Sequence, residues 1–207
     1  MEHYYNDSMF GENYFTYPRF YSQMVSLFHD GCHFVEVGSW KGRSAAFMAV
    51  EIHNSGKKIK FDCVDTWKGS ETEEQHQNDK FVKTDTLYEK FLENTRRVNH
   101  IITPIRKSSV EAAKDYADAS LDFVFIDGDH RYECVLEDIK AWLPKIKNLG
   151  VIAGHDYGWC TDVRKAVHEV LGIGEGGYSD SYEEGYSSYD DDFGEGCWVY
   201  QVITEKE

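Results

Sequence analysis

The sequence predicts a doubly wound α/β fold, in which helices cover both faces of a mostly parallel sheet. Short apolar runs of strand length alternate with amphipathic stretches along most of the chain. These runs are apolar at nearly every position, which is typical of strands buried on both faces of a parallel sheet. Repeated alternation of such strands with helices indicates successive βαβ units.

Six segments are predicted strands and five are predicted helices. The strands are expected at 33–38, 59–65, 101–106, 121–127, 149–154 and 197–203. The helices are expected at 43–53, about 78–97, 109–116, 131–143 and 161–171. Asp129 and Thr161 are the predicted N-caps of the last two helices, because short oxygen-bearing side chains satisfy the free N–H groups there.

Two segments depart from this alternation within one predicted domain of residues 1–207. The first 30 residues are expected to form a helical segment that packs against the sheet or over its carboxyl edge. Residues 172–196 are rich in Gly, Ser, Tyr and acidic residues, and they predict a flexible acidic loop.

Composition excludes several classes of partner. The chain carries 22 basic and 37 acidic residues, so its net charge of −15 argues against a broad surface for nucleic acid or anionic membrane. No apolar run is long enough to span a bilayer, and the N-terminus lacks the features of a signal peptide. Five scattered cysteines without a CxxC pair predict reduced thiols in a cytoplasmic protein.

A glycine-rich turn follows the first predicted strand, where open α/β sheets bind ligands. Gly38 and Gly42 let the backbone turn tightly and approach a ligand, and Ser44 can cap the following helix. The turn differs from GxGxxG, and Glu36 lies two residues before its first glycine. This carboxylate would repel the pyrophosphate of a dinucleotide and attract an ammonium group.

A second acid, Asp65, ends the second predicted strand, where a carboxylate can accept both hydroxyls of a ribose. An ammonium site at Glu36 and a ribose site at Asp65 together favour S-adenosylmethionine (SAM) over NAD. The alternatives are that both acids merely cap the sheet, or that the chain is an NAD-dependent dehydrogenase.

Further polar residues follow the fourth and fifth predicted strands. Asp127 ends the fourth strand, His130 comes three residues later, and His155 and Asp156 follow the fifth strand. Because adjacent parallel strands end at the same edge, we expect their carboxylate and imidazole groups to converge. A neutral imidazole suits proton transfer near pH 7, although a lone histidine is more often structural.

Five motifs in order resemble those of class I SAM-dependent methyltransferases. They are "FVEVGSWKGRSA", "VDTWKGS", "SSVEAAKDY", "LDFVFIDGDHRY" and "VIAGHDY". The resemblance covers about residues 30–171 and is closest to the branch of catechol and macrolide-sugar O-methyltransferases. It implies a Rossmann-like sheet of seven strands with one antiparallel strand, for which "CWVYQVI" is the candidate.

The resemblance also implies how SAM is held. Glu36 and Ser44 would bind the methionine part, Gly38 would pass beneath the cofactor, and Asp65 would take the ribose. The remaining predicted cofactor contacts are Ser39, Trp40, Gly42, Thr66, Ser108, Ser109 and Asp127. Trp40 occupies a position that is often glycine in the wider superfamily.

Similar enzymes bind a divalent cation after strands four and five, which implies a site for Mg²⁺ or Mn²⁺ at Asp127 and Asp156. His155 departs from the family pattern, since that position is more often acidic, and an imidazole ligand would favour Mn²⁺, Fe²⁺ or Zn²⁺ over Mg²⁺. The alternative is that Asp127 contacts the cofactor without a metal. His130 matches the position of the general base, with Asp127 as the second catalytic residue.

The predicted reaction is therefore methyl transfer to a hydroxyl of a small-molecule acceptor, such as a sugar or another vicinal diol. The acceptor site would be built from residues 1–30, 68–80 and 172–196, which carry no motif. The alternative is a SAM-binding protein with no catalysis or another reaction, like the cephalosporin hydroxylase-like relatives. A homo-oligomer is compatible with the sequence, which carries no signal for it.

Overall fold

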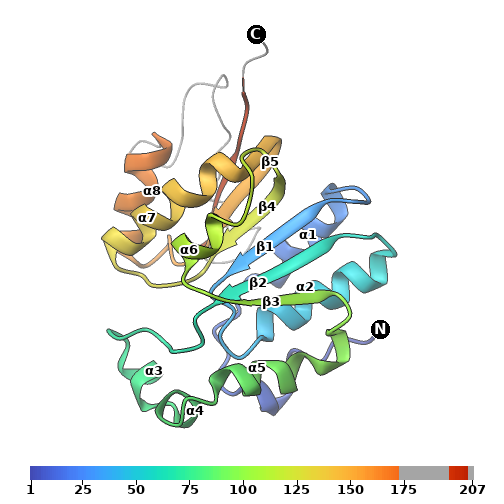
Figure 1. Cartoon of the computed structure of the whole chain (residues 1–207), viewed down its shortest axis with the longest axis vertical. Coiled ribbons are helices and arrows are strands. Elements are labelled where there is room, and N and C mark those ends of the chain that lie inside the picture. Colours follow the sequence, from blue (N-terminus) through green and yellow to red (C-terminus); the bar gives the residue numbers. More distant parts are fainter. Residues whose placement is uncertain (173–195, 205–207) are drawn as a thin grey trace.

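The computed structural model describes residues 1–172 and 196–204, and Figure 1 shows their arrangement. Six strands form one sheet in the order β3-β2-β1-β4-β5-β6. Their bounds are His33–Val37 (β1), Lys60–Asp65 (β2), Ile102–Arg106 (β3), Leu121–Ile126 (β4), Ile146–Gly154 (β5) and Trp198–Gln201 (β6). The first five strands pair in parallel, and β6 pairs with β5 in the antiparallel direction. The predicted doubly wound sheet is confirmed.

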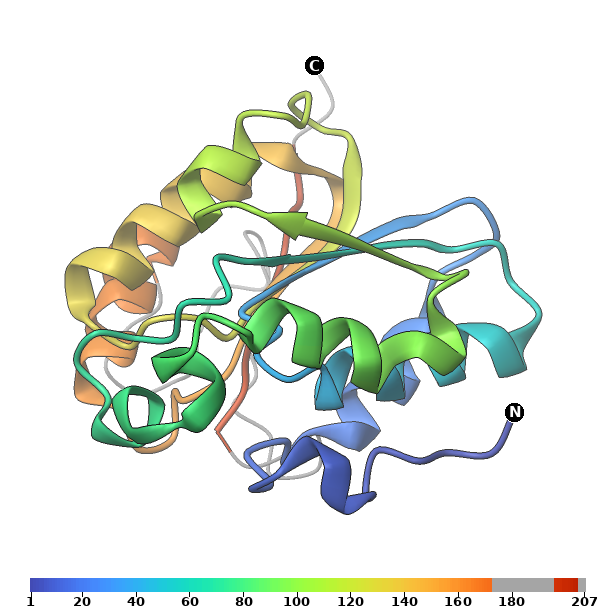
Figure 2. The same ribbon diagram turned by 60° about the horizontal axis from the view of Figure 1, so that its bottom comes forward.

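Helices cover both faces of this sheet. They are α1 (Pro18–Leu27), α2 (Arg43–Ser55), α3 (Glu74–Asn78), α4 (Lys80–Lys83), α5 (Leu87–Thr95), α6 (Ser109–Ala113), α7 (Tyr132–Trp142) and α8 (Thr161–Leu171), with short 3-10 turns at Ser8–Phe10, Arg96–Val98 and Leu143–Lys145. In Figure 2 the yellow and orange helices α7 and α8 lie on the side opposite to the blue α1 and α2.

The two faces of the sheet carry two separate cores. Phe34 of β1 and Phe125 of β4 pack with α1, α2 and α5, whereas Val35 and Val124 pack with α6, α7 and α8. Alternate side chains of a strand point to opposite faces, so each nearly continuous apolar run supplies both cores.

Two expectations from the sequence were wrong in detail, and a third stays a prediction. The described residues form six strands rather than seven, and the sequence itself contains only six strand-like runs. The helix expected at about 78–97 is divided into α4 and α5, because Asp79 caps a short helix and Asp85 adopts a left-handed φ of 53° between them. The predicted acidic loop at 172–196 falls almost entirely outside the described residues.

The predicted helix caps are also displaced. Gly42, at a left-handed φ of 83°, holds the N-cap position of α2, and Ser44 is the second residue of that helix. Thr161 is the first residue of α8 rather than its cap. Asp129 lies two residues before the N-cap of α7, although its side chain accepts a hydrogen bond from the Arg131 N–H at 2.9 Å.

Gly38 brings the glycine-rich turn against the end of β4. Its φ is +90°, and a Cβ built there would lie 1.9 Å from the carbonyl oxygen of Asp127. The Asp127 N–H in turn donates to the Val37 carbonyl at 2.8 Å. Only glycine allows this approach, so the turn after β1 and the acid after β4 occupy one site.

The N-terminal segment both packs on the sheet and reaches its carboxyl edge. The α1 rings of Phe20 and Tyr21 lie with centroids 5.7 and 5.0 Å from that of Phe125 in β4. Residues before α1 continue to the carboxyl ends of the strands, where they line a cavity. Among the described helices, none has both the length and the apolar character needed to cross a membrane.

Candidate active site

A cavity of about 640 Å³ lies at the carboxyl ends of the parallel strands. Its walls come from five stretches of chain, within residues 10–17, 38–44, 73–76, 127–130 and 155–159. Three of these stretches follow β1, β4 and β5, so the strand ends form the floor. A volume of this size suits a small-molecule ligand.

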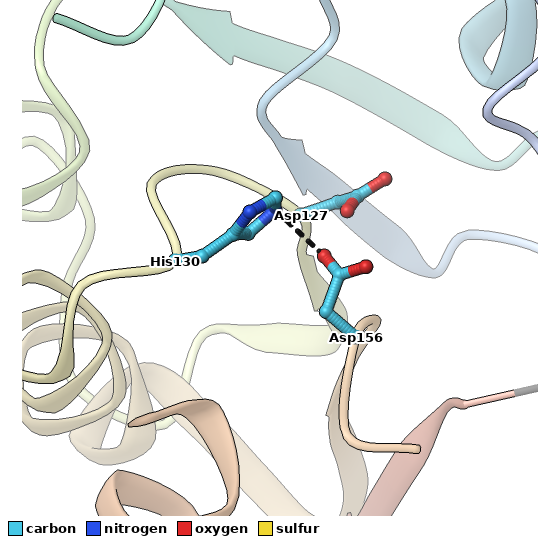
Figure 3. Close-up of side chains that lie close together, drawn as sticks. All are labelled: Asp127, His130 and Asp156. Carbon is cyan, nitrogen blue, oxygen red and sulfur yellow. Dashed lines mark ion pairs between the residues drawn. The ribbon is translucent and has the colours of Figure 1, made fainter. Parts of the chain in front are cut away.

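The predicted acids and one histidine converge beside this cavity (Figure 3). Asp127, His130 and Asp156 each offer a ligand atom, and these atoms lie within 4.8 Å of one another. The Nε2 atom of His130 lies 2.7 Å from Oδ2 of Asp156. Asp127 follows β4 and Asp156 follows the adjacent β5, so the predicted convergence is present. Two carboxylates and an imidazole form a donor set that fits a divalent cation.

His155 lies against the same two acids but faces the N-terminal segment. Its Nδ1 atom is 3.0 Å from Oδ1 of Asp156 and 3.6 Å from Oδ1 of Asp127. Its Nε2 atom hydrogen-bonds the Thr16 hydroxyl at 2.9 Å. The sequence predicted His155 as the histidine that joins Asp127 and Asp156 in a metal site. In the structure, the histidine whose ligand atom lies within 4.8 Å of both acids is His130.

The acids hold both imidazoles in their charged forms. Burial opposes the charge of His130, but the hydrogen bond and the charge of Asp156 outweigh it and raise the pKa of His130 to about 9. Burial likewise opposes the charge of His155, and bonds to Asp127 and Asp156 raise its pKa to about 10. Burial alone would raise the pKa of Asp156, but the two histidines lower it.

Asp156 is held in a strained backbone conformation. Its φ is +66°, which is uncommon for a residue with a side chain, and the residue is 5% exposed. Its carboxylate also accepts a hydrogen bond from the Trp159 indole N–H at 2.8 Å. Strain of this kind persists where the surrounding contacts fix the residue, and it is typical of functional sites.

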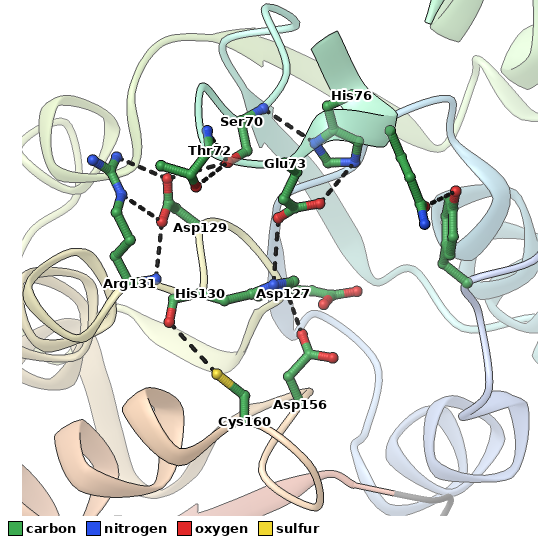
Figure 4. A network of polar contacts seen from close by, with 12 residues as sticks. Ser70, Thr72, Glu73, His76, Asp127, Asp129, His130, Arg131, Asp156 and Cys160 are labelled. Atoms are coloured by element: carbon green, nitrogen blue, oxygen red, sulfur yellow. Dashed lines mark hydrogen bonds and ion pairs between the residues drawn. The ribbon is translucent and has the colours of Figure 1, made fainter. Parts of the chain in front are cut away.

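A carboxylate that the sequence did not single out joins two histidines across the cavity (Figure 4). Glu73 lies 3.3 Å from Nδ1 of His130 through Oε1 and 3.3 Å from Nε2 of His76 through Oε2. The Nδ1 atom of His76 accepts the Ser70 N–H, and its ring stacks on Trp40 at a centroid distance of 4.0 Å. The spacing of three residues between Glu73 and His76 is a weak signal by itself.

Glu36 is buried with one free oxygen. The residue is 1% exposed, and its Oε2 accepts the Tyr21 hydroxyl at 2.8 Å. Its Oε1 is buried without a hydrogen-bond partner among the described residues. Burial raises the pKa of Glu36 to about 7, while the hydroxyls of Tyr21, Ser39 and Ser44 act in the opposite direction. An unpaired buried acceptor is unfavourable, so this oxygen fits a cationic ligand.

Asp65 joins two loops through its carboxylate. Its Oδ2 accepts the Trp40 N–H at 2.8 Å and its Oδ1 accepts the Trp67 N–H at 2.7 Å. Burial raises the pKa of Asp65, and the two backbone N–H groups oppose that rise. The neighbouring Thr66 hydroxyl accepts the Lys68 N–H at 3.2 Å.

The cavity lining divides the predicted cofactor residues. Gly38, Ser39, Trp40, Ser44 and Asp127 are part of it. The others are outside the group of lining residues, namely Glu36, Gly42, Asp65, Thr66, Ser108 and Ser109.

The two serines lie at the start of α6. Ser108 donates to Glu111 at 2.8 Å, whereas Ser109 accepts the Trp142 indole N–H at 2.9 Å. Contact with adenine stays a prediction for both, and the second bond links α6 to α7.

Two tyrosines are further residues that sequence reasoning missed. Tyr17 donates to Oδ2 of Asp127 at 2.7 Å, and Tyr21 donates to Oε2 of Glu36. Their spacing of four residues places both on one side of a helix, which was readable in "YPRFY". That spacing does not predict which acids accept hydrogen bonds from the two tyrosine hydroxyls.

A family model described as a methyltransferase domain matches residues 35–157, more than half of the chain. The chain belongs to this methyltransferase family. The matched range contains the glycine-rich turn, Asp65, Asp127, His130 and Asp156.

Curated relatives resemble much of the chain. It is 27% identical over 198 residues to the uncharacterized protein R132 of Acanthamoeba polyphaga mimivirus, covering 93% of this chain and 84% of that protein. It is 28% identical over 131 residues to the uncharacterized protein y4gI of Sinorhizobium fredii. That second match covers 63% of this chain and 13% of y4gI, so the methyltransferase spans a small part of that relative's length.

Solved structures show the same fold. The O-methyltransferase NovP has a TM-score of 0.59 at 16% identity, with 90% of this chain and 80% of NovP covered. The O-methyltransferase TomG from Streptomyces achromogenes, solved in complex with SAM, has a TM-score of 0.56 at 13% identity, with 90% of this chain and 79% of TomG covered. These likenesses support a Rossmann-like methyltransferase architecture.

Proposed function

We propose that this methyltransferase transfers a methyl group from SAM to a hydroxyl of a small-molecule acceptor, with the assistance of a divalent cation. The observation that carries the proposal is the convergence of Asp127, His130 and Asp156 beside the glycine-rich turn that follows Glu36. O-methyltransferases among the structural neighbours support the reaction class, and the bound SAM in TomG supports the cofactor.

The residues around Glu36 would hold the methionine part of SAM. The free Oε1 of Glu36 would accept the ammonium group, with Ser44 nearby, while Gly38, Ser39 and Trp40 would shape the floor. Gly42 would act through the backbone turn that it forms before α2. When bound, SAM supplies an electrophilic methyl group on a sulfonium centre. A dinucleotide fits less well, because its pyrophosphate would face the Glu36 carboxylate.

Asp65 would receive the ribose. Each of its oxygens accepts one backbone N–H, and a carboxylate oxygen has room for a second donor. The carboxylate can therefore bind ribose hydroxyls while it holds Trp40 and Trp67. We assign the adenine to the neighbourhood of Thr66, Ser108 and Ser109.

A divalent cation would be held by Asp127 and Asp156, with His130 or His155 as the third donor. When bound, it supplies electrostatic stabilisation to a deprotonated acceptor hydroxyl. Mixed oxygen and nitrogen donors favour Mn²⁺, Fe²⁺ or Zn²⁺ relative to Mg²⁺.

His130 would act as general base if it does not ligate through Nε2. With a pKa raised to about 9, its imidazole carries a proton at pH 7 and is not ready to accept another. Neutralising the charge of Asp156 would remove the main favourable partner of that proton and lower the pKa. The general-base role therefore requires that Asp156 be engaged by a cation.

Binding and turnover assays test the proposal. Calorimetry should show that the purified chain binds SAM and S-adenosylhomocysteine, and Asp65→Ala should weaken both. Mass spectrometry of reactions with SAM, Mn²⁺ and a panel of diols, sugars and catechols should reveal a product that is heavier by one methyl group. Tight NAD binding without SAM binding would overturn the cofactor assignment. Transfer only to a nitrogen or carbon acceptor would overturn O-methylation.

A further inference from the structure

Two phenols on one helical face each reach a different acid of the candidate site. Tyr17, immediately before α1, donates to Oδ2 of Asp127 at 2.7 Å. Tyr21, one turn later within α1, donates to Oε2 of Glu36 at 2.8 Å. The two acids lie at the ends of the neighbouring strands β4 and β1.

Each phenol occupies one oxygen of its acid and leaves the other available. For Glu36 the remaining Oε1 is buried and has no hydrogen-bond partner among the described residues. For Asp127 the remaining Oδ1 forms a long ion pair of 3.6 Å with Nδ1 of His155, which leaves room for a closer ligand. A hydrogen bond to one oxygen restrains rotation of the carboxylate about the C–C bond that carries it, so the second oxygen has a defined direction.

The core holds both rings in place. Tyr17 is 1% exposed and contacts Phe15, Phe125 and His155, with ring centroids 4.7, 4.6 and 4.8 Å away. Tyr21 is 0% exposed and lies 5.0 Å from Phe125 and 5.1 Å from Tyr17. Because close-packed rings cannot swing aside, the hydroxyls act as fixed donors.

Both hydroxyls remain neutral donors. Burial and the neighbouring acids raise the pKa of Tyr17 and of Tyr21 well above the ordinary value for a phenol. Burial of a tyrosine is favourable when its O–H finds an acceptor, and here the acceptors are the two acids of the site.

We infer that Tyr17 and Tyr21 are positioning residues, which aim Asp127 at the divalent cation and Glu36 at the ammonium group of SAM. This inference rests on the proposed function, since it assigns the free oxygens to those two ligands. It gives the N-terminal segment a role in ligand binding besides covering the sheet.

A crossed binding experiment on the full chain tests the inference. Tyr21→Phe should weaken SAM binding by roughly tenfold, because the hydrogen bond that orients the charged Glu36 is lost. The same variant should leave Mn²⁺ binding within about twofold of wild type, because Tyr21 does not donate to Asp127. Tyr17→Phe should weaken Mn²⁺ binding by a similar factor and leave SAM binding unchanged. Calorimetry measures SAM affinity, and electron paramagnetic resonance of free Mn²⁺ measures metal affinity.

Tyr4→Phe is the matched control. Tyr4 is 4% exposed in the same core, and its hydroxyl has no hydrogen-bond partner among the described residues. Removing that hydroxyl should change neither affinity. Thermal unfolding of each variant establishes that the chain is folded under the binding conditions.

Double variants sharpen the test. Tyr21→Phe should add little to the SAM-binding defect of Glu36→Gln, and Tyr17→Phe should add little to the Mn²⁺-binding defect of Asp127→Asn, because each pair acts through one bond. Equal losses of both affinities in each tyrosine variant, or no losses, would overturn the inference. A wild-type chain that binds neither SAM nor Mn²⁺ would instead overturn the proposed function.

Discussion

Two aspartate–histidine pairs at opposite ends of the sheet have similar geometry and different surroundings. At the carboxyl edge, His130 lies 2.7 Å from Asp156. In the amino-terminal half of the strands, His33 of β1 lies 2.6 Å from Asp62 of β2. The first pair lines the cavity, whereas His33 and Asp62 are outside its lining.

The partners of the two pairs explain the difference. One oxygen of Asp62 takes His33, the Tyr116 hydroxyl at 2.9 Å and the Lys60 ammonium at 3.6 Å. These donors connect strands to the segment after α6, so the pair serves packing. Asp156 is held by side chains that also face a cavity, where a ligand can replace them. A close aspartate–histidine contact therefore identifies a site only when its partners are accessible.

Loss of the divalent cation should have the largest effect on methyl transfer. Only the acids at the carboxyl edge, and not Asp62 of the amino-terminal pair, should be needed to bind that cation. A chelator is expected to abolish methyl transfer, while SAM affinity is retained because the proposed contacts of SAM with Glu36 and Asp65 need no metal. Asp127→Asn and Asp156→Asn should each weaken Mn²⁺ binding by at least about 100-fold, and Asp62→Asn should not weaken it. Activity assays and metal titrations measure these effects. Full activity of protein that elemental analysis shows to be metal-free would refute a cation-assisted reaction.

His130→Ala and His33→Ala form the next comparison. If His130 is the general base, its removal should lower kcat by about 10²–10⁴-fold without changing SAM affinity. His33→Ala should retain kcat and lose stability.

The pH profile separates the general base from a structural residue. In wild type the rate should rise with pH as His130 loses its proton. The pKa of His130 is about 9 without a cation, and a bound cation should lower it, so the rise should occur below pH 9. That rise should vanish in His130→Ala. An unchanged profile in an active His130→Ala protein would reduce this residue to a structural role.

Glu36 should give SAM binding a pH dependence of intermediate size. Because burial raises its pKa to about 7, the carboxyl takes up a proton as the pH falls below 7 and loses its attraction for an ammonium group. SAM affinity should then decrease by up to about tenfold per pH unit. Calorimetry between pH 5.5 and 7.5 measures it. Glu36→Gln should bind weakly with a flat profile, and a flat wild-type profile would contradict the assignment.

The amino-terminal pair should show the smallest effect, on stability alone. Its hydrogen bonds, with that of His33 foremost, outweigh burial and lower the pKa of Asp62. A lowered folded-state pKa contributes stability above the unfolded pKa of about 4, and that stability is lost as the pH falls through the folded value. His33→Ala should reduce the free energy of unfolding by about 1–3 kcal/mol at pH 7. Urea unfolding measures this change, and a proportional loss of kcat would contradict a purely structural role.

The strands and most of the helices were readable from local pattern. All six predicted strands overlap observed ones, and α8 has the predicted bounds of 161–171. The sequence predicted one helix where the structure has α4 and α5. The amphipathic pattern continues across Asp85, whose left-handed φ breaks the helix. Apolar periodicity reports burial and does not report a single backbone angle.

Residue order along the chain was sufficient to place Asp127 and Asp156 at one edge, because parallel neighbouring strands must end together. Local pattern also predicted a tight turn at Gly38 after the first strand, whereas its close approach to Asp127 is visible only in the structure. These features depend on strand direction and backbone geometry, which the alternation of apolar runs already implies.

The pairing of donors with acids depended on the packed molecule. Tyr17 reaches Asp127 across 110 positions of sequence, Glu73 reaches His130, and His130 rather than His155 joins the convergent group. Such contacts are selected by how α1 and the segment before α3 settle on the strand ends. Side-chain direction there is a property of packing, because loops and helix ends have no periodic pattern that fixes where a hydroxyl or an imidazole points.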